Sequence, residues 1–203
     1  IFLLLFFVVS LSFSQDKGTE YWWQLSPEIR VNTNKFEFRY RPYETFIISN
    51  TESSSKTTFG RTDFMAGFLH KKFKFFVYSK FETRKKSFIG PRIDFSTRVF
   101  NDRLLLHGQY RYFWGLNEKS KDHQYLITLI EYDTKQFFNF GVLGYNKQTF
   151  EGSTIIFYGP VVSFSLSKNV SFMVSYLKDF NIRSRYFTFV RMNIKFKTQK
   201  AKK

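Results

Sequence analysis

The chain has 203 residues, of which 22% are aromatic and 24% charged; it has no cysteine and a formal net charge of +16. Without cysteine it can form neither a disulfide framework nor a thiolate metal site. Soluble domains rarely combine so many aromatic and charged side chains, whereas a barrel with one face in lipid and one in water requires both. The positive charge implies an anionic partner such as a nucleic acid, anionic lipid head groups or an acidic solute.

The first residues have the pattern of an export signal. Residues 1–9 form an uninterrupted apolar run, and serine then occupies every second position of residues 10–14. A short apolar core followed by small residues predicts a secretory signal peptide at residues 1–14, cleaved after Ser14. The alternative is a membrane anchor, but this run and every later apolar run are well short of the roughly 20 residues that a spanning helix needs.

The segment 21–41 has the pattern of an amphipathic β-hairpin. From residue 23 to residue 32 every second side chain is apolar and the intervening ones are polar, which is the period of a strand. After a turn at 32–34 the alternation resumes, with Phe36, Phe38 and Tyr40 opposite Glu37 and Arg39. One face of this hairpin is therefore apolar and aromatic, and the other is charged.

Nine further strand-like runs follow, at residues 59–69, 73–82, 92–99, 104–114, 124–132, 137–145, 155–166, 170–178 and 185–196. They have about the 9–11 residues that a tilted strand needs to cross a bilayer. The run 124–132 is apolar on both faces, so its inner face is not assigned. Short turns alternate with longer polar loops, as in outer-membrane barrels. The pattern predicts an all-β fold, a single antiparallel transmembrane β-barrel over residues 15–196, with a basic C-terminal tail at residues 197–203.

The number of strands conflicts with one general rule. The runs add up to eleven, whereas bacterial single-chain barrels have an even number. Because the first connection is short, the first strand would also begin on the rim that carries the longer, extracellular loops. Either one strand is missed or split, or residues 15–22 return through the lumen. We therefore expect ten to twelve strands, and the first hairpin is where this topology would change.

If the apolar sets face lipid, the intervening sets line the lumen. Basic residues outnumber acidic ones there, the acids being Glu28, Glu37, Asp63, Glu82 and Asp94. The guanidinium fork of arginine suits two-point contact with carboxylate, sulfate or phosphate. The predicted anion-binding residues of the lumen are Arg30, Arg39, Arg41, Arg61, Lys74, Lys80, Arg92, Arg98, Arg111, Arg185, Arg191 and Lys195.

The signal peptide, the first strand with Trp22 and Trp23, and the aromatic strand from Tyr186 to Phe196 together resemble a small Gram-negative outer-membrane barrel. Many such barrels end at the terminal aromatic residue, whereas this chain continues for seven more residues. The resemblance implies location in the outer membrane, contact with its lipid and lipopolysaccharide, and insertion by the barrel-assembly machinery. The charged lumen resembles that of monomeric oligogalacturonate-type porins, which pass acidic oligosaccharides. The chain is equally similar to uncharacterised barrel families of unknown function.

Three interpretations of the barrel remain open. The surplus of basic residues could make a narrow, anion-selective pore for small acidic solutes. Alternatively, arginine and acidic side chains pair and fill a closed structural barrel without transport. Candidate pairs are Arg39 with Glu28 or Glu37, and Arg92 or Arg98 with Asp94. In a soluble, lipocalin-like barrel, the third interpretation, the faces would be inverted around an apolar ligand.

An enzyme is not expected. Of the three histidines, His70 is expected in a turn and His123 at a loop end, so that only His107 is expected to point inward, and it has no His-x-Ser pattern. Without a serine placed for a histidine base, we expect no catalytic residue. No histidine spacing suits a metal, so we also expect no metal ligand, and no motif suggests a cofactor. We also expect no nucleic-acid partner, because the signal peptide removes the chain from the cytoplasm and the cations are spread over every strand.

Overall fold

The computed structural model describes residues 19–33, 35–49, 55–83, 85–152, 154–181 and 185–198. The predicted signal peptide at residues 1–14 lies outside these ranges, as do residues 199–203 of the predicted tail. Residues 197 and 198 continue the last strand, so the barrel extends slightly past its predicted end at residue 196. No helix within the described ranges is long and apolar enough to span a membrane.

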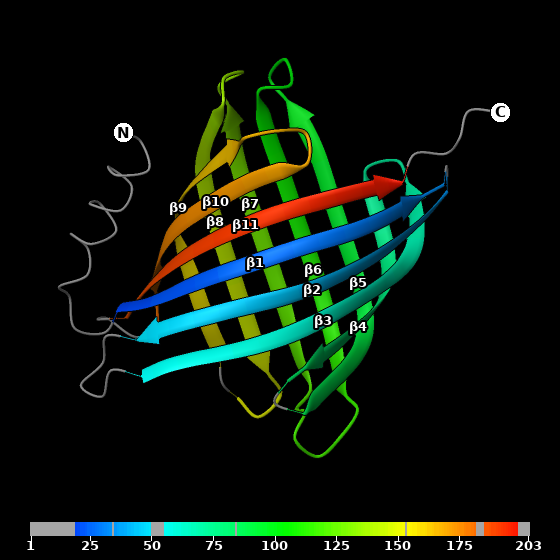
Figure 1. The fold of residues 1–203 in the computed structure, drawn as a ribbon, viewed down its shortest axis with the longest axis vertical. Coiled ribbons are helices and arrows are strands. Elements are labelled where there is room, and N and C mark those ends of the chain that lie inside the picture. Colours follow the sequence, from blue (N-terminus) through cyan, green and yellow to red (C-terminus); the bar gives the residue numbers. More distant parts are fainter. Residues whose placement is uncertain are drawn as a thin grey trace.

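The described ranges contain eleven strands that form one closed barrel (Figure 1). The strands are β1 Thr19–Asn32, β2 Phe36–Ser49, β3 Ser55–His70, β4 Phe73–Glu82, β5 Lys86–Val99, β6 Leu104–Gly115, β7 His123–Asp133, β8 Phe138–Thr149, β9 Thr154–Ser165, β10 Val170–Asp179 and β11 Tyr186–Thr198. The predicted all-β barrel is thus confirmed, and its strand number lies within the expected range.

The barrel closes between its first and last strands. Each strand pairs with the next in antiparallel fashion, whereas β1 pairs with β11 in parallel, from Thr19 opposite Tyr186 to Val31 opposite Thr198. An odd number of up-and-down strands requires this, because the first and last strands then run in the same direction (Figure 1). The prediction of a purely antiparallel barrel is therefore wrong at this one seam. Residues 19–22 belong to β1, so they do not return through the lumen.

The connections form two rims. The turn rim, where β1 ends, carries the connections at 33–35, 71–72, 100–103, 134–137 and 166–169, where short turns are predicted. The loop rim, where β1 begins, carries 50–54, 83–85, 116–122, 150–153 and 180–185. Several strands extend further toward this rim than predicted, so the connection at 83–85 is as short as the turns. The predicted alternation of short and long connections therefore holds only in part.

Alternation assigns the two faces of the wall. In β1, Leu25 and Ile29 are about two-fifths exposed on the outside, whereas Ser26 and Glu28 are 1% and 3% exposed inside. Large, exposed apolar side chains occur on the outer face of every strand except β10. The prediction that apolar side chains point outward and polar ones inward therefore holds for the first hairpin. The outer surface of the whole barrel is largely apolar.

Neighbouring strands approach one another closely at several glycines. A Cβ atom at Gly90 would lie 1.8 Å from the carbonyl oxygen of Tyr112, and one at Gly141 would lie 1.9 Å from that of Ile130. Only glycine fits at such positions, and glycine is the usual residue at sharp bends of barrel strands. At these glycines the strands can therefore lie closer together than a side chain would allow.

Candidate anion-binding site in the lumen

The barrel encloses a cavity of about 950 Å³ to which all eleven strands contribute side chains. This volume lies near the upper end of the roughly 300–1,000 Å³ that small-molecule sites occupy. Eleven of the twelve predicted basic residues line the cavity. The exception is Arg98, which lies at the turn rim, where it donates to the carbonyl oxygen of Asp102 and pairs with Asp133 at 2.9 Å.

Alternation correctly identified which side chains of β5 point inward, but it could not show how far along the barrel each one lies. Arg98 was therefore predicted in the lumen although it lies at the turn rim. Three further basic residues, Lys72, Lys86 and Lys147, also line the cavity. They were missed because β5 begins and β8 ends beyond the predicted boundaries, and because Lys72 lies in a turn. Longer strand boundaries would have found Lys86 and Lys147 from the sequence.

Many lumen charges are neutralised by buried ion pairs. Arg92 donates twice to Asp94, both bonds at 2.7 Å, and Arg39 donates to Glu37. Both are pairs anticipated from the sequence. Glu28 accepts from Arg30 and from Arg41, which lies on the neighbouring strand. Such buried pairs need further hydrogen bonds to offset the desolvation of both ions, and Gln109 supplies one by donating to Asp94 at 2.8 Å.

Two guanidinium groups are not neutralised in this way. Arg191 Nε donates to Gln24 Oε1 at 2.6 Å, and Arg111 donates to Gln109 Oε1. Both acceptors are neutral amides, and no carboxylate of the described residues pairs with either arginine. Arg111 Nε is buried without a hydrogen-bond partner within the described part of the chain. These two cations are therefore ready to accept an anion.

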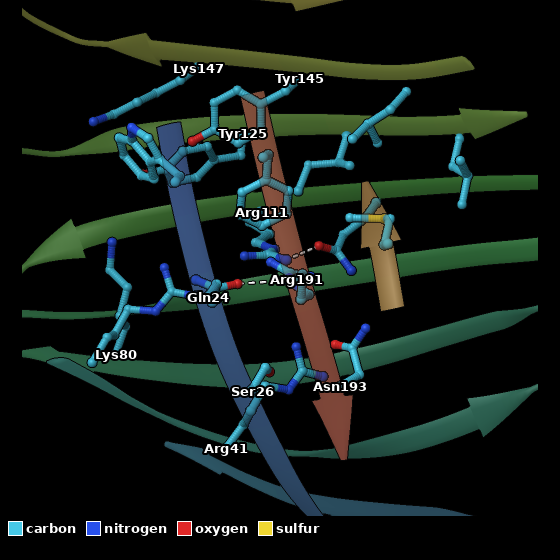
Figure 2. Close-up of a pocket in the computed structure, with 18 of the residues that line it drawn as sticks. Gln24, Ser26, Arg41, Lys80, Arg111, Tyr125, Tyr145, Lys147, Arg191 and Asn193 are labelled. Carbon is cyan, nitrogen blue, oxygen red and sulfur yellow. Dashed lines mark hydrogen bonds between the residues drawn. The ribbon is translucent and has the colours of Figure 1, made fainter. Parts of the chain in front are cut away.

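Arg111 and Arg191 both reach toward the middle of the cavity. They come from β6 and β11, which lie on opposite sides of the eleven-strand ring, and Figure 2 shows both side chains pointing into its centre. An anion placed between them would supply the charged acceptor that their amide partners do not provide.

Tyrosine rings support the same cluster of cations. The Tyr43 ring, which is 2% exposed, has Arg61 at 4.1 Å, Arg41 at 5.5 Å and Arg191 at 5.9 Å from its centroid. Arg111 lies 5.3 Å from the Tyr78 ring. Attraction between a guanidinium and an aromatic face holds the cation without neutralising it. Arg41 and Arg61 also pair with Glu28 and Asp63, so the rings leave available only the charges of Arg111 and Arg191 among the arginines of this cluster that the structure describes.

The wall opposite this charged region is apolar. Ile127, Leu129, Leu143, Ile155 and Phe157 line the cavity from β7, β8 and β9. Around them, Val161, Leu177 and Phe187 complete a packed apolar cluster. The structure thereby assigns the run whose inner face alternation left open, since Ile127 and Leu129 point inward. Sequence reasoning missed this feature because these strands are apolar on both faces.

A smaller pocket of about 200 Å³ lies at the loop rim. Lysines dominate its lining, with Lys119, Lys121 and Lys147 joined by His123. Glu82, which pairs with Lys80 at 3.2 Å, is the acidic residue of this lining. The loop rim is therefore basic where the lumen opens toward it.

The structure brings one histidine and one serine together. His107 faces the cavity, and Ser96 lies opposite it on the neighbouring strand. No hydrogen bond joins the two among the described residues, and the adjacent Asp94 is already bound by Arg92 and Gln109. No group of three or more metal-ligating side chains lies together in the described ranges.

The lumen therefore combines a central, partly uncompensated cluster of arginines, a basic rim and an apolar wall. Carboxylates, sulfates and phosphates suit the first two elements. No protein-family model, curated protein or solved structure matches the chain.

Proposed function

We propose that the protein is an integral β-barrel of the outer membrane whose lumen binds small acidic solutes and passes them as a narrow, anion-selective pore. The outer face supports the first half of this proposal. Val77, Phe140 and Val142 are about half exposed or more on the outside of the wall. A water-facing surface of this kind would be costly, at roughly 25 cal/mol for each Å² of apolar area, whereas lipid removes the cost.

The observation that carries the second half is the pair of central guanidinium groups. Among the described residues, Arg111 and Arg191 have only amide oxygens as acceptors. Unpaired charges in a low-dielectric interior are expensive, so proteins keep them mainly where they bind a ligand or an ion. Rings of basic side chains are also the usual basis of anion selectivity in pores.

Location and partners follow from the same proposal. The signal peptide expected at residues 1–14 would direct export, and the barrel-assembly machinery would insert the strands. At the loop rim, Lys119 and Lys121 would meet the anionic groups of lipopolysaccharide if this rim faces outward. The loop rim is also the rim from which an acidic solute would approach.

Two other functions compete with this proposal. The ion pairs of Arg39, Arg92 and their partners favour a closed structural barrel. That function does not explain why Arg111 and Arg191 have no carboxylate partner among the described residues. A soluble, lipocalin-like barrel would have apolar side chains inside and charges outside. The exposed apolar outer face argues against that arrangement, although the apolar wall inside resembles it locally.

Purified protein reconstituted in planar lipid bilayers provides the test. We expect discrete conductance steps whose reversal potential in a salt gradient shows preference for the anion. Replacing both Arg111 and Arg191 by glutamine should reduce this preference. Silent bilayers with heat-modifiable, folded protein would contradict the pore in favour of a closed barrel. Failure of the protein to float with liposomes would contradict membrane insertion altogether.

A further inference from the structure

The lumen wall has two chemically different sides. On β1 to β6 the inward side chains are mostly charged or polar, as at Glu28, Arg41 and Asp94. On β7 to β10 they are mostly apolar, as at Leu129 and Leu143. A path for small hydrated anions gains nothing from an apolar wall, because water against that wall is unfavourable. The wall suggests that the occupant has an apolar part.

The two sides meet at β11. The guanidinium carbon of Arg191 lies 4.9 Å from the centroid of the Phe189 ring. From there a row of stacked rings continues, with Phe187 6.0 Å from Phe189 and Phe157 5.3 Å from Phe187. A group bound by Arg191 would therefore have the apolar wall directly beside it. The space beside Arg191, here called the head-group site together with that beside Arg111, is therefore continuous with the apolar wall.

The head-group site can hold a single anionic group. Arg111 and Arg191 approach it from opposite sides of the barrel (Figure 2). Each can present N–H donors, and a carboxylate accepts two parallel hydrogen bonds from a guanidinium. The apolar wall around Leu143 then receives whatever chain is attached to that carboxylate.

We propose that the lumen binds an anionic amphiphile, with its carboxylate between Arg111 and Arg191 and its hydrocarbon chain against Leu129, Leu143 and Phe157. This inference rests on the proposed function and narrows its acidic solutes to those that carry an apolar chain. The cavity of about 950 Å³ has room for a head group and a medium-length chain together, being within the usual range for small-molecule sites.

Isothermal titration calorimetry on the full-length protein in lipid nanodiscs, with empty nanodiscs subtracted, tests this proposal. The probes are octanoate, acetate with the same head group and no chain, and octanol with the same chain and no charge. We expect octanoate to bind at least tenfold more tightly than either control. The double variant R111Q/R191Q should lose at least tenfold in octanoate affinity, whereas the control R98Q, outside the cavity, should match the wild type.

A second variant addresses the apolar side without touching the arginines. Leu129→Asn keeps a similar branched shape but replaces the two methyl groups by an amide, so it should weaken octanoate binding several-fold and leave acetate binding unchanged. Heat-modifiable migration in gels reports whether each variant is folded. If acetate binds as tightly as octanoate while the bilayers show anion selectivity, this inference fails and the proposed function stands. If octanol binds as tightly as octanoate, the proposal that Arg111 and Arg191 bind the carboxylate is contradicted.

Discussion

The inner faces of β1 to β6 and of β7 to β10 fill the interior of the barrel with different kinds of side chain. The first face fills its space with ion pairs such as Arg92 with Asp94, supported by Gln109, beside a smaller cluster of buried rings and Met65 from β3 to β6. The second fills it with an apolar cluster around Leu143, Val161 and Leu177. Both leave one shared cavity between them. The difference shows that the lumen wall is charged on one side of the barrel and apolar on the other.

The comparison also separates structural charges from available ones. Carboxylates of the charged side neutralise Arg39 and Arg92. Arg111 and Arg191 have no such partner among the described residues, although they line the same cavity. Because buried ion pairs add little net stability but are costly to break, the paired arginines fix the wall in place. The unpaired ones are the candidates for function.

Breaking a buried pair should have the largest effect. Asp94→Ala removes the carboxylate that accepts two 2.7 Å bonds from Arg92. The guanidinium would remain buried and uncompensated, so we expect a loss of about 4 kcal/mol in the free energy of unfolding. Urea titration of the protein folded into liposomes, followed by tryptophan fluorescence, measures this loss.

The matched control for this variant is a similar pair at the turn rim. Arg98 and Asp133 lie 2.9 Å apart, with side chains that are 40% and 20% exposed. An exposed pair contributes at most about 1 kcal/mol, so Asp133→Asn should have a small effect. Equal losses for Asp94→Ala and Asp133→Asn would show that the charged side is as well hydrated as the rim.

The apolar side should be less sensitive to a single change. Leu177 is 2% exposed within its cluster, and Leu177→Ala should cost about 3 kcal/mol because it leaves an unfilled space. The same titration applies, with the outward-facing Leu126→Ala as control. Leu126 is 45% exposed, and its truncation leaves no internal space. If both variants lose the same stability, the inner cluster is not packed as the structure has it.

Alternation allowed the barrel to be predicted from sequence, because one apolar and one charged face fix the orientation of strands such as β1 and β2. It could not assign β7, whose Leu126 and Ile127 point to opposite faces but are equally apolar. It could not give the depth of Arg98 along the lumen. Eleven strand-like runs were counted, but the even-number rule for bacterial barrels argued against that number. The parallel pairing of β1 with β11, which an odd number of strands requires, was not predicted.

The candidate site was predictable as a set of basic residues but not as a geometry. Sequence spacing cannot show that Arg111 and Arg191, 80 positions apart, both point into the middle of the lumen. Nor can it show which arginines are neutralised, since that depends on the register between strands. The apolar wall could not be predicted for a similar reason, because only closure of the barrel turns Leu129 and Leu143 toward the arginines.

A crystal structure of the protein with 8-bromooctanoate tests the amphipathic lumen most directly, because anomalous scattering locates the bromine. The account predicts a bromine peak inside the barrel against Leu143, with the carboxylate between Arg111 and Arg191. Val142, the next residue, points outward and is 51% exposed, so it provides the opposite case on the same strand. Bromine found only on the outer face near Val142, with no ligand in the lumen, would contradict the account.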